Sequence, residues 1–302
     1  MSGAAPDDRP LGKRIGDQAI NATLMAALGA MRLLPYETRL RAFANLTTTV
    51  IAPMAGWRKR IRDNLDLVWP DLPEAEKTRL VRAVPAELGR TVMEFFSPDE
   101  FRARLKGVTF EGPGADALHA AARAKRPLIL VSGHHSDYGC IGILMSDLYG
   151  GVGTLYRPLS NAPFNAHYVA AMEAATKPLF PRTRRGLAEM VKYLRAGNPV
   201  AILHDQHMDD GLPLRFFGQT AMTAPSPAEM ALKYDAPLIP VYAVRQPDGL
   251  SFRVEVEAPV PPSDPATMMQ ALNDSLEARV RANPDQWMWI HRRWRAVQEG
   301  RR

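Results

Sequence analysis

The chain has 302 residues, of which 46% are hydrophobic and 23% charged, a composition typical of a globular protein with a substantial core. Its formal net charge of +6 favours anionic partners such as phosphate groups, an acidic carrier protein or an anionic membrane surface. The dispersed basic residues, without zinc-finger spacing or a basic helix, argue against nucleic acid, and the single cysteine excludes an intrachain disulfide and fits a reducing compartment.

The first third of the chain is predicted to be helical. Residues 1–14 are polar, with prolines and mixed charges, so we expect a disordered leader there and no signal peptide. Residues 15–100 follow helical patterns and are expected to form a region that associates with a membrane. Breaks in these helices are expected at Pro35, Pro53, Pro70 and Pro85.

Two stretches of this region are weakly polar. Residues 21–34 and 40–57 are rich in apolar residues, and the basic run Arg58-Lys59-Arg60 follows them. They could pack as a buried helical hairpin, which their composition favours, or lie in a lipid interface beside the basic run. No segment reaches the roughly 18 apolar residues that a membrane span requires.

Strands and helices alternate through residues 101–302, which we expect to form one α/β domain. Strands are predicted at 108–112, 127–131, 152–156, 199–204, 237–245 and 252–257. Helices are predicted at 138–148, 186–196, 225–233 and 266–282. Short and nearly all-apolar strands between helices indicate a mostly parallel central sheet that is covered by helices on both faces.

A histidine follows the strand at 127–131. The strand stops at Gly133 and brings His134 to its carboxyl end, where open α/β proteins place their chemistry. Histidine suits proton transfer near neutral pH, so His134 is a candidate general base. Asp137 could orient its imidazole or, like Ser136, cap the next helix, and His135 is a substitute base.

Arginines follow the next strands. Arg157 ends the strand at 152–156 and is a candidate for binding an anion or a developing oxyanion. Arg184 and Arg185, together with Arg182, precede the helix at 186–196, whose N-terminus also favours anions. Solvated surface positions are the alternative for these three side chains.

Polar residues also end the strand at 199–204. Asp205 and Gln206 are expected to support the same cleft, while the run His204-Asp205-Gln206-His207 lacks the spacing of a hydrolytic zinc site, so no metal is predicted. Residues 215–218 and 222–225 are expected to form a loop that leads into a helix. Residues 284–295 mix tryptophans with arginines, which permits a membrane-interface belt, an anion site or simple packing.

From Met31 to Arg295, ordered segments of the chain resemble the lipid A biosynthesis lauroyl/myristoyl acyltransferase family within the lysophospholipid acyltransferase superfamily. The segments are Asp63-Asn64-Leu65, residues 87–94, Ser132-Gly133-His134, Tyr156-Arg157-Pro158, Asp205-Gln206, Phe216-Phe217-Gly218, residues 222–225 and residues 285–293. Each segment alone is weak evidence for the family, but the whole set in this order makes the resemblance specific.

The resemblance implies that a fatty acyl chain moves from an acyl thioester, carried by acyl carrier protein or coenzyme A, to the hydroxyl of a lipid acceptor. It implies a histidine base, no cofactor beyond this co-substrate, and a peripheral position on the cytoplasmic side of the inner membrane. The acceptor could be a lipid A precursor, a lysophospholipid or a lyso-lipid that contains an amino acid. An apolar groove beside the helix at 138–148 and the N-terminal helices would set the acyl length.

The chain departs from the family pattern at the residue that should orient the histidine. The pattern places Asp or Glu five residues after the histidine, and here that position is Gly139, or Cys140 counted from His135. We expect Asp137 to take this role, with the distant acids Glu94, Asp147 and Asp205 as alternatives. A broken pair would instead make the chain a lipid-binding or carrier-binding protein with impaired catalysis.

Overall fold

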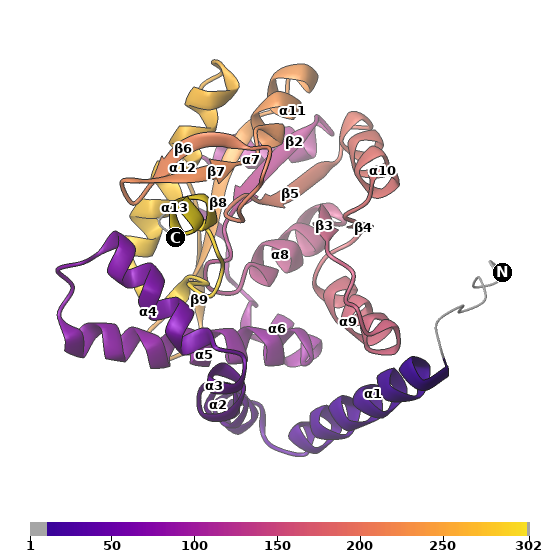
Figure 1. The fold of residues 1–302 in the computed structure, drawn as a ribbon. Helices are drawn as coiled ribbons and strands as arrows, with labels where there is room; N and C mark the ends of the chain where they lie inside the picture. The colour runs from indigo at the N-terminus through magenta and orange to yellow at the C-terminus, as the bar shows by residue number, and fades with distance from the viewer. Residues whose placement is uncertain (1–10, 301–302) are drawn as a thin grey trace.

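The computed structural model describes residues 11–300 and has an α/β fold with a helical N-terminal region (Figure 1). The central sheet has seven strands in the order β1-β9-β8-β2-β5-β3-β4. Only β8 and β9 pair antiparallel, and every other neighbouring pair is parallel. The predicted fold class, a mostly parallel sheet flanked by helices, is therefore confirmed.

The strands of this sheet are β1 (Phe110–Glu111), β2 (Leu128–Ser132), β3 (Gly153–Tyr156), β4 (Leu179–Pro181), β5 (Pro199–Leu203), β8 (Leu238–Arg245) and β9 (Phe252–Val256). The helices of the α/β part are α7 (Ala115–Arg123), α8 (Gly139–Tyr149), α9 (Ala162–Ala175), α10 (Arg184–Arg195), α11 (Ser226–Tyr234), α12 (Pro265–Ala282), a 3-10 turn η2 (Pro284–Gln286) and α13 (Arg295–Gly300). All six predicted strands and four predicted helices are present. Strand β4 and helices α7, α9 and α13 were not predicted.

The central strand β2 shows why these short apolar segments form a buried sheet. Leu128 and Leu130 pack into the hydrophobic cluster that includes residues of α7 and α8. Ile129 and Val131 point to the other face and join residues of α10, α11 and α12. Because successive side chains of a strand alternate between faces, a strand with helices on both sides needs apolar residues at every position.

The loop expected at residues 215–218 and 222–225 leads into helix α11 as predicted, but up to residue 223 it is wrong. Strands β6 (Leu212–Phe216) and β7 (Gln219–Thr223) form an antiparallel hairpin there. Its two-residue turn has Phe217 at φ 53° and Gly218 at φ 70°, the left-handed pair of a tight hairpin turn. Asn-Gly is the usual sequence signal for such a turn, and the Phe-Gly pair found here does not predict one.

The N-terminal region contains α1 (Leu11–Arg32), α2 (Tyr36–Leu46), a π-helical turn η1 (Thr47–Ile51), α3 (Ala52–Met54), α4 (Trp57–Val68), α5 (Glu74–Phe95) and α6 (Pro98–Arg104). The break expected at Pro85 is wrong, since α5 continues through it. Its buried neighbours Leu80 and Val84 pack with the C-terminal tryptophans, and this burial offsets the hydrogen bond that proline removes.

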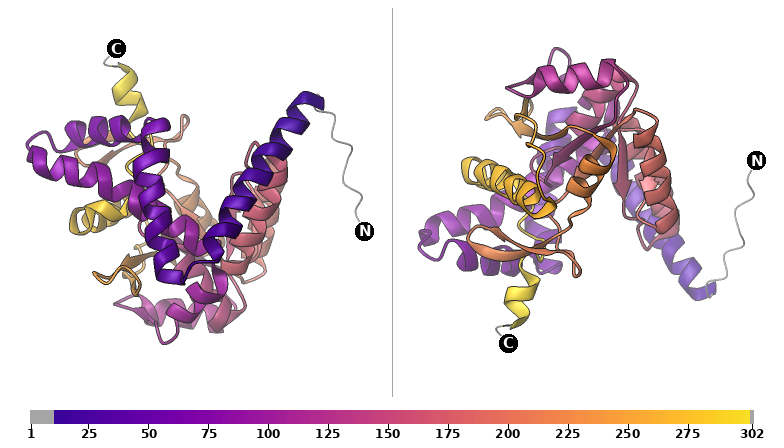
Figure 2. Two further views of the ribbon diagram at one scale, coloured as in Figure 1. Left: turned by 90° about the horizontal axis from the view of Figure 1, so that it is seen from below. Right: turned by 90° about the horizontal axis from the view of Figure 1, so that it is seen from above.

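Helix α1 packs against the rest of the protein on one side only. It runs along α9 (Figure 2), and its remaining surface is mostly exposed, including Ile20 and Leu24. The favoured buried hairpin therefore holds for α2, which buries Leu40 and Ala44, and in part for α1, which buries Leu28 in the same cluster as Leu40. Residues 1–10 of the expected leader lie outside the described residues, and residues 11–14 belong to α1. None of the helices between residues 11 and 300 is long and apolar enough to cross a membrane.

Candidate active site

Four neighbouring parallel strands bring the candidate residues to one edge of the sheet. The register pairs Ser132 of β2 with Leu203 of β5, so the chain reaches His134 and Asp205 two residues beyond each partner. In the same way β3 pairs Tyr156 with Pro181 of β4, and an arginine follows each of these two strands. Parallel pairing thus places residues 71 positions apart in the sequence side by side.

His134 is hydrogen-bonded to Asp205. The ring Nδ1 lies 2.8 Å from Asp205 Oδ1, and the backbone N–H of His134 donates to Asp205 Oδ2 at 2.7 Å. A proton on Nδ1 that is donated to the carboxylate leaves Nε2 with its lone pair. A methyl group on Gly133 would meet Leu276 side-chain atoms at 2.7 Å and 2.8 Å, so glycine allows the strand end to approach helix α12.

Asp205 is fully buried and ionised. Burial by itself raises the pKa of a carboxyl group, but the charge and hydrogen bond of His134, with smaller effects of His291 and His204, lower the pKa of Asp205 well below its ordinary value. The indole Nε1 of Trp287 also donates to Asp205 Oδ2, at 2.9 Å. A buried carboxylate with three hydrogen bonds is a fixed negative charge beside the imidazole.

Asp137 does not contact His134, contrary to the expected pairing. Its Oδ1 accepts a hydrogen bond at 2.8 Å from the backbone N–H of Gly139, the first residue of α8. Burial and the neighbouring Glu94 raise the pKa of Asp137 well above its ordinary value, and Glu94 itself is held by Arg245 through two hydrogen bonds of 2.6 Å. The local turn therefore points this side chain at a buried acidic neighbour and away from the imidazole.

A side chain at Gly139, where the family pattern has its carboxylate, would have to displace its neighbours. A Cβ on Gly139 would lie 2.7 Å from Asp137 Oδ1 and 3.0 Å from Phe95 Cε1. Of the other distant acids, Glu94 is engaged by Arg245, and Asp147 forms an exposed ion pair with Arg102. Asp205 is the acid that the fold brings to His134.

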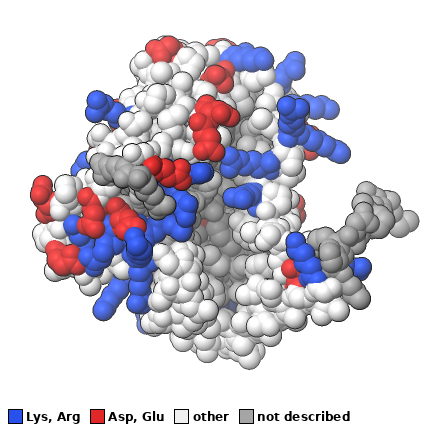
Figure 3. Space-filling view, in the orientation of Figure 1, with Lys and Arg blue, Asp and Glu red and all other residues white. Residues whose placement is uncertain are grey.

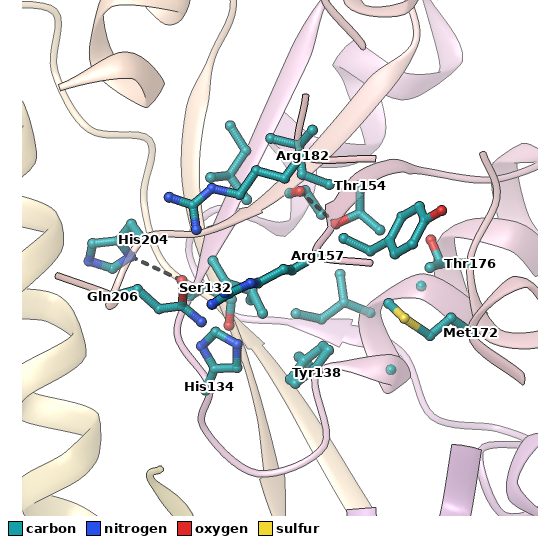
Figure 4. Close-up of a pocket in the computed structure, with 18 of the residues that line it drawn as sticks. Ser132, His134, Tyr138, Thr154, Arg157, Met172, Thr176, Arg182, His204 and Gln206 are labelled. Carbon is teal, nitrogen blue, oxygen red and sulfur yellow. Dashed lines mark hydrogen bonds between the residues drawn. The ribbon is translucent and has the colours of Figure 1, made fainter. Parts of the chain in front are cut away.

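A cavity of about 680 Å³ opens in front of His134. Figure 4 shows His134, Gln206 and Arg157 at one end and Met172 and Thr176 at the other. The walls of the deeper part are largely apolar, and they include Phe95, Leu130, Ile141, Val152 and Met172. A cavity of this size and character fits an extended apolar ligand with a polar reacting end.

Two arginines line the polar end of the cavity. Arg157 and Arg182 reach toward the space above His134 and Gln206 (Figure 4). Arg184 and Arg185 lie outside the cavity lining, on the exposed first turn of α10, where Arg185 forms an ion pair with Glu189. Basic side chains of α10 are visible on the face shown in Figure 3. Arg157 and Arg182 each follow directly after a strand, and this shared position in the sequence could have identified them as a pair.

Residues of the C-terminal segment also lie at the site, although the sequence did not predict them as site residues. The ring of His291 packs edge-on against that of His134, with 4.9 Å between centroids, and burial lowers the pKa of His291 to about 4. It is therefore neutral at physiological pH. Arg293 donates from Nη1 to the backbone oxygen of Gln206 at 3.3 Å and to that of Met222 at 2.7 Å. The tryptophans of residues 284–295 and Arg293 are thus packed inside the protein, whereas Arg292 and Arg295 are exposed.

Within residues 11–300 no three His, Cys, Asp or Glu side chains are grouped so that they could hold a metal ion. His204 instead faces the carbonyl oxygen of Ser132, with Nδ1 at 3.0 Å. His207 Nε2 lies 3.1 Å from Asp209 Oδ1. The side chains of the run at 204–207 therefore do not converge.

Comparison with known proteins gives one consistent result. The family model described as bacterial lipid A biosynthesis acyltransferase matches residues 14–296. The chain is 28% identical over 279 residues to a lipid A biosynthesis lauroyltransferase of Escherichia coli, covering 88% of each protein. It is 24% identical over 287 residues to a phosphatidylinositol mannoside acyltransferase of Mycobacterium tuberculosis, covering 90% of this chain and 88% of that protein. It is also 24% identical over 243 residues to a lipid A biosynthesis palmitoleoyltransferase of Escherichia coli.

Proposed function

The chain belongs to the bacterial lipid A biosynthesis acyltransferase family, and we propose that this acyltransferase moves a fatty acyl chain from a thioester to a hydroxyl group of a lipid acceptor. The observation that carries the proposal is the pair of His134 and buried Asp205 at the polar end of a deep, largely apolar cavity. The proposed donor is acyl carrier protein or coenzyme A, and no other cofactor takes part.

In the proposed reaction the acyl chain occupies the apolar part of the cavity. Its thioester carbonyl lies near His134, Arg157 and Arg182. His134 Nε2 takes the proton of the acceptor hydroxyl as its oxygen attacks the carbonyl carbon. Asp205 stabilises the imidazolium that forms.

Collapse of the tetrahedral intermediate completes the transfer. The carbon–sulfur bond breaks, and the imidazolium returns its proton to the departing sulfur, so that the products are an acyl ester and a free thiol. Arg157 and Arg182 are placed to stabilise the negative charge on the carbonyl oxygen or to hold an anionic group of a substrate. Gln206 lines the same end of the cavity and is proposed to orient the acceptor.

The acceptor can be identified from the lipids of a strain that lacks the gene. We expect one acylated lipid to disappear and its hydroxylated precursor to accumulate, because the missing enzyme would have acylated that hydroxyl group. Mass spectrometry of total lipids then separates a lipid A precursor, a lysophospholipid and a lyso-lipid that contains an amino acid. The wild-type gene should restore the product, and an unchanged lipid profile would contradict the proposed activity.

We further propose that α1 attaches the protein to the surface of an anionic membrane, on the cytoplasmic side of the inner membrane. Residues 18–31 contain no Lys, Arg, Asp or Glu, and Lys13 and Arg14 precede them on the exposed start of the helix. Ile20 and Leu24 lie one turn apart, with relative exposures of 54% and 39%. An apolar helical face beside basic residues is typical of helices that lie in a lipid interface.

The double substitution Ile20→Asp and Leu24→Asp should reduce binding to vesicles of phosphatidylethanolamine and phosphatidylglycerol about tenfold or more, because each exposed side chain loses roughly 1.5–3 kcal/mol of apolar transfer. Vesicle cosedimentation measures the bound fraction. The control is Leu148→Asp with Leu232→Asp, two similarly exposed leucines on α8 and α11. Equal binding by both double variants would remove α1 from the membrane contact.

A further inference from the structure

The segment at residues 286–288 lies across the loop that carries His134. The backbone N–H of Ser136 donates to the carbonyl oxygen of Gln286 at 2.6 Å, and the N–H of Met288 donates to that of His134 at 3.1 Å. His135 and Trp287 form an isolated antiparallel bridge between these contacts. The C-terminal segment therefore holds the histidine loop from outside the sheet.

Trp287 is the side chain that links this segment to the reacting pair. Its indole is 1% exposed and donates from Nε1 to Oδ2 of Asp205 at 2.9 Å. Asp205 also receives two hydrogen bonds from His134, one from the ring and one from the backbone. An indole has one N–H donor and no acceptor, so Trp287 orients the carboxylate without being able to take its proton.

We propose that Trp287 is a positioning residue for acyl transfer, which fixes the carboxylate of Asp205 in the orientation that holds His134 toward the thioester. The inference rests on the proposed role of the His134–Asp205 pair. Without the indole donor, Asp205 keeps only the two hydrogen bonds from His134, and its plane is free to tilt with the imidazole.

The indole also limits how strongly Asp205 attracts the proton of the imidazolium. A donor to Oδ2 spreads the negative charge of the carboxylate, and its removal leaves more of that charge directed at His134. The imidazole then holds a proton to higher pH, and a smaller fraction is available as a base. Positioning by Trp287 therefore has a consequence for the pH profile that simple packing does not have.

Trp287→Phe removes the donor and keeps an aromatic ring among Phe216, Trp289 and Trp294. We expect kcat to fall about tenfold with KM within twofold, because a hydrogen bond to a charged group is lost on the reacting pair. The acid limb of the pH profile of kcat/KM should move up by about half to one pH unit.

The matched control is Trp289→Phe. Trp289 is equally buried two residues along the chain, but its Nε1 donates to the carbonyl oxygen of Pro284. We expect its acid limb to stay in place. If both variants shift the profile equally, or if folded Trp287→Phe keeps the wild-type kcat and profile, the positioning role is wrong.

A double-mutant cycle tests whether Trp287 acts through Asp205. In an Asp205→Asn background, Trp287→Phe should change kcat by less than twofold, whereas additive losses would contradict the proposal. An NMR titration of the His134 imidazole, assigned by its loss in His134→Gln, should show the same upward shift in Trp287→Phe without any substrate. This shift needs no reaction and would be seen even if the proposed acyl transfer were wrong. A failure of the positioning role of Trp287 can therefore be told apart from a failure of the proposed function.

Discussion

Replacement of His134 by alanine should lower kcat for acyl transfer by about 10²–10⁴-fold while KM changes little, because general-base catalysis by a positioned side chain contributes on this scale. The ring lies at the polar end of the cavity with Nδ1 committed to Asp205, so Nε2 is the nitrogen that can accept the acceptor's proton.

The measurement uses purified protein, an acyl thioester and the acceptor identified from the lipid comparison, with release of thiol and formation of acylated lipid followed together. His167→Ala, on the exposed surface of α9, is the control for loss of an imidazole and should retain the wild-type rate. If folded His134→Ala keeps wild-type activity, His134 is not the general base. If the wild-type protein binds lipid or carrier and transfers nothing, the impaired-catalysis alternative is correct.

The second large effect separates the two candidate carboxylates. Asp205→Asn should lower kcat by about 10²–10⁴-fold, because an amide neither stabilises the imidazolium nor holds the Nδ1 tautomer reliably. Asp137→Asn should leave kcat within about threefold of wild type, since Asp137 contacts the start of α8 and Glu94 and does not contact His134. The opposite ranking of the two variants would return the orienting role to Asp137.

The stability of Asp137→Asn gives an independent measurement with a defined sign. The pKa of Asp137 is raised in the folded protein, so above its unfolded value near 3.8 the unfolded chain releases a proton that the folded chain retains. The free energy of unfolding therefore falls as pH rises through this window. Asparagine resembles the protonated acid and does not titrate, so this loss of stability with rising pH is absent in Asp137→Asn. Urea unfolding should therefore show that the free energy of unfolding of Asp137→Asn, relative to wild type, is higher at pH 8 than at pH 5.

Membership of an acyltransferase family and the site agree on the class of reaction, and the site adds which residues of this chain could perform it. The family pattern places a carboxylate where this chain has Gly139, and the structure supplies a different carboxylate from a neighbouring strand. The departure in sequence therefore leaves the imidazole paired. Asp137→Asn and Asp205→Asn, measured side by side, test whether that pairing is catalytic.

The sequence by itself determined the sheet and the position of the histidine. Strands β2, β3, β5 and β8 are short apolar runs bounded by turn residues, and such runs alternating with helices indicate strands that are buried on both faces. A histidine directly after β2 must then lie at the carboxyl edge of the sheet. The same local logic misses the hairpin at Phe217-Gly218 and the continuation of α5 through Pro85, where packing overrides the local signal.

Only the tertiary structure decided which groups His134 meets. Asp137 is three residues away and was the expected partner, but the turn after β2 directs it to the N–H of Gly139. Asp205 and Trp287 are remote in sequence, and they reach the site because β5 pairs with β2 in register and the C-terminal segment crosses the loop at its end. Strand order and register are properties of the whole sheet, which is why the base could be predicted from a local pattern and its partners could not.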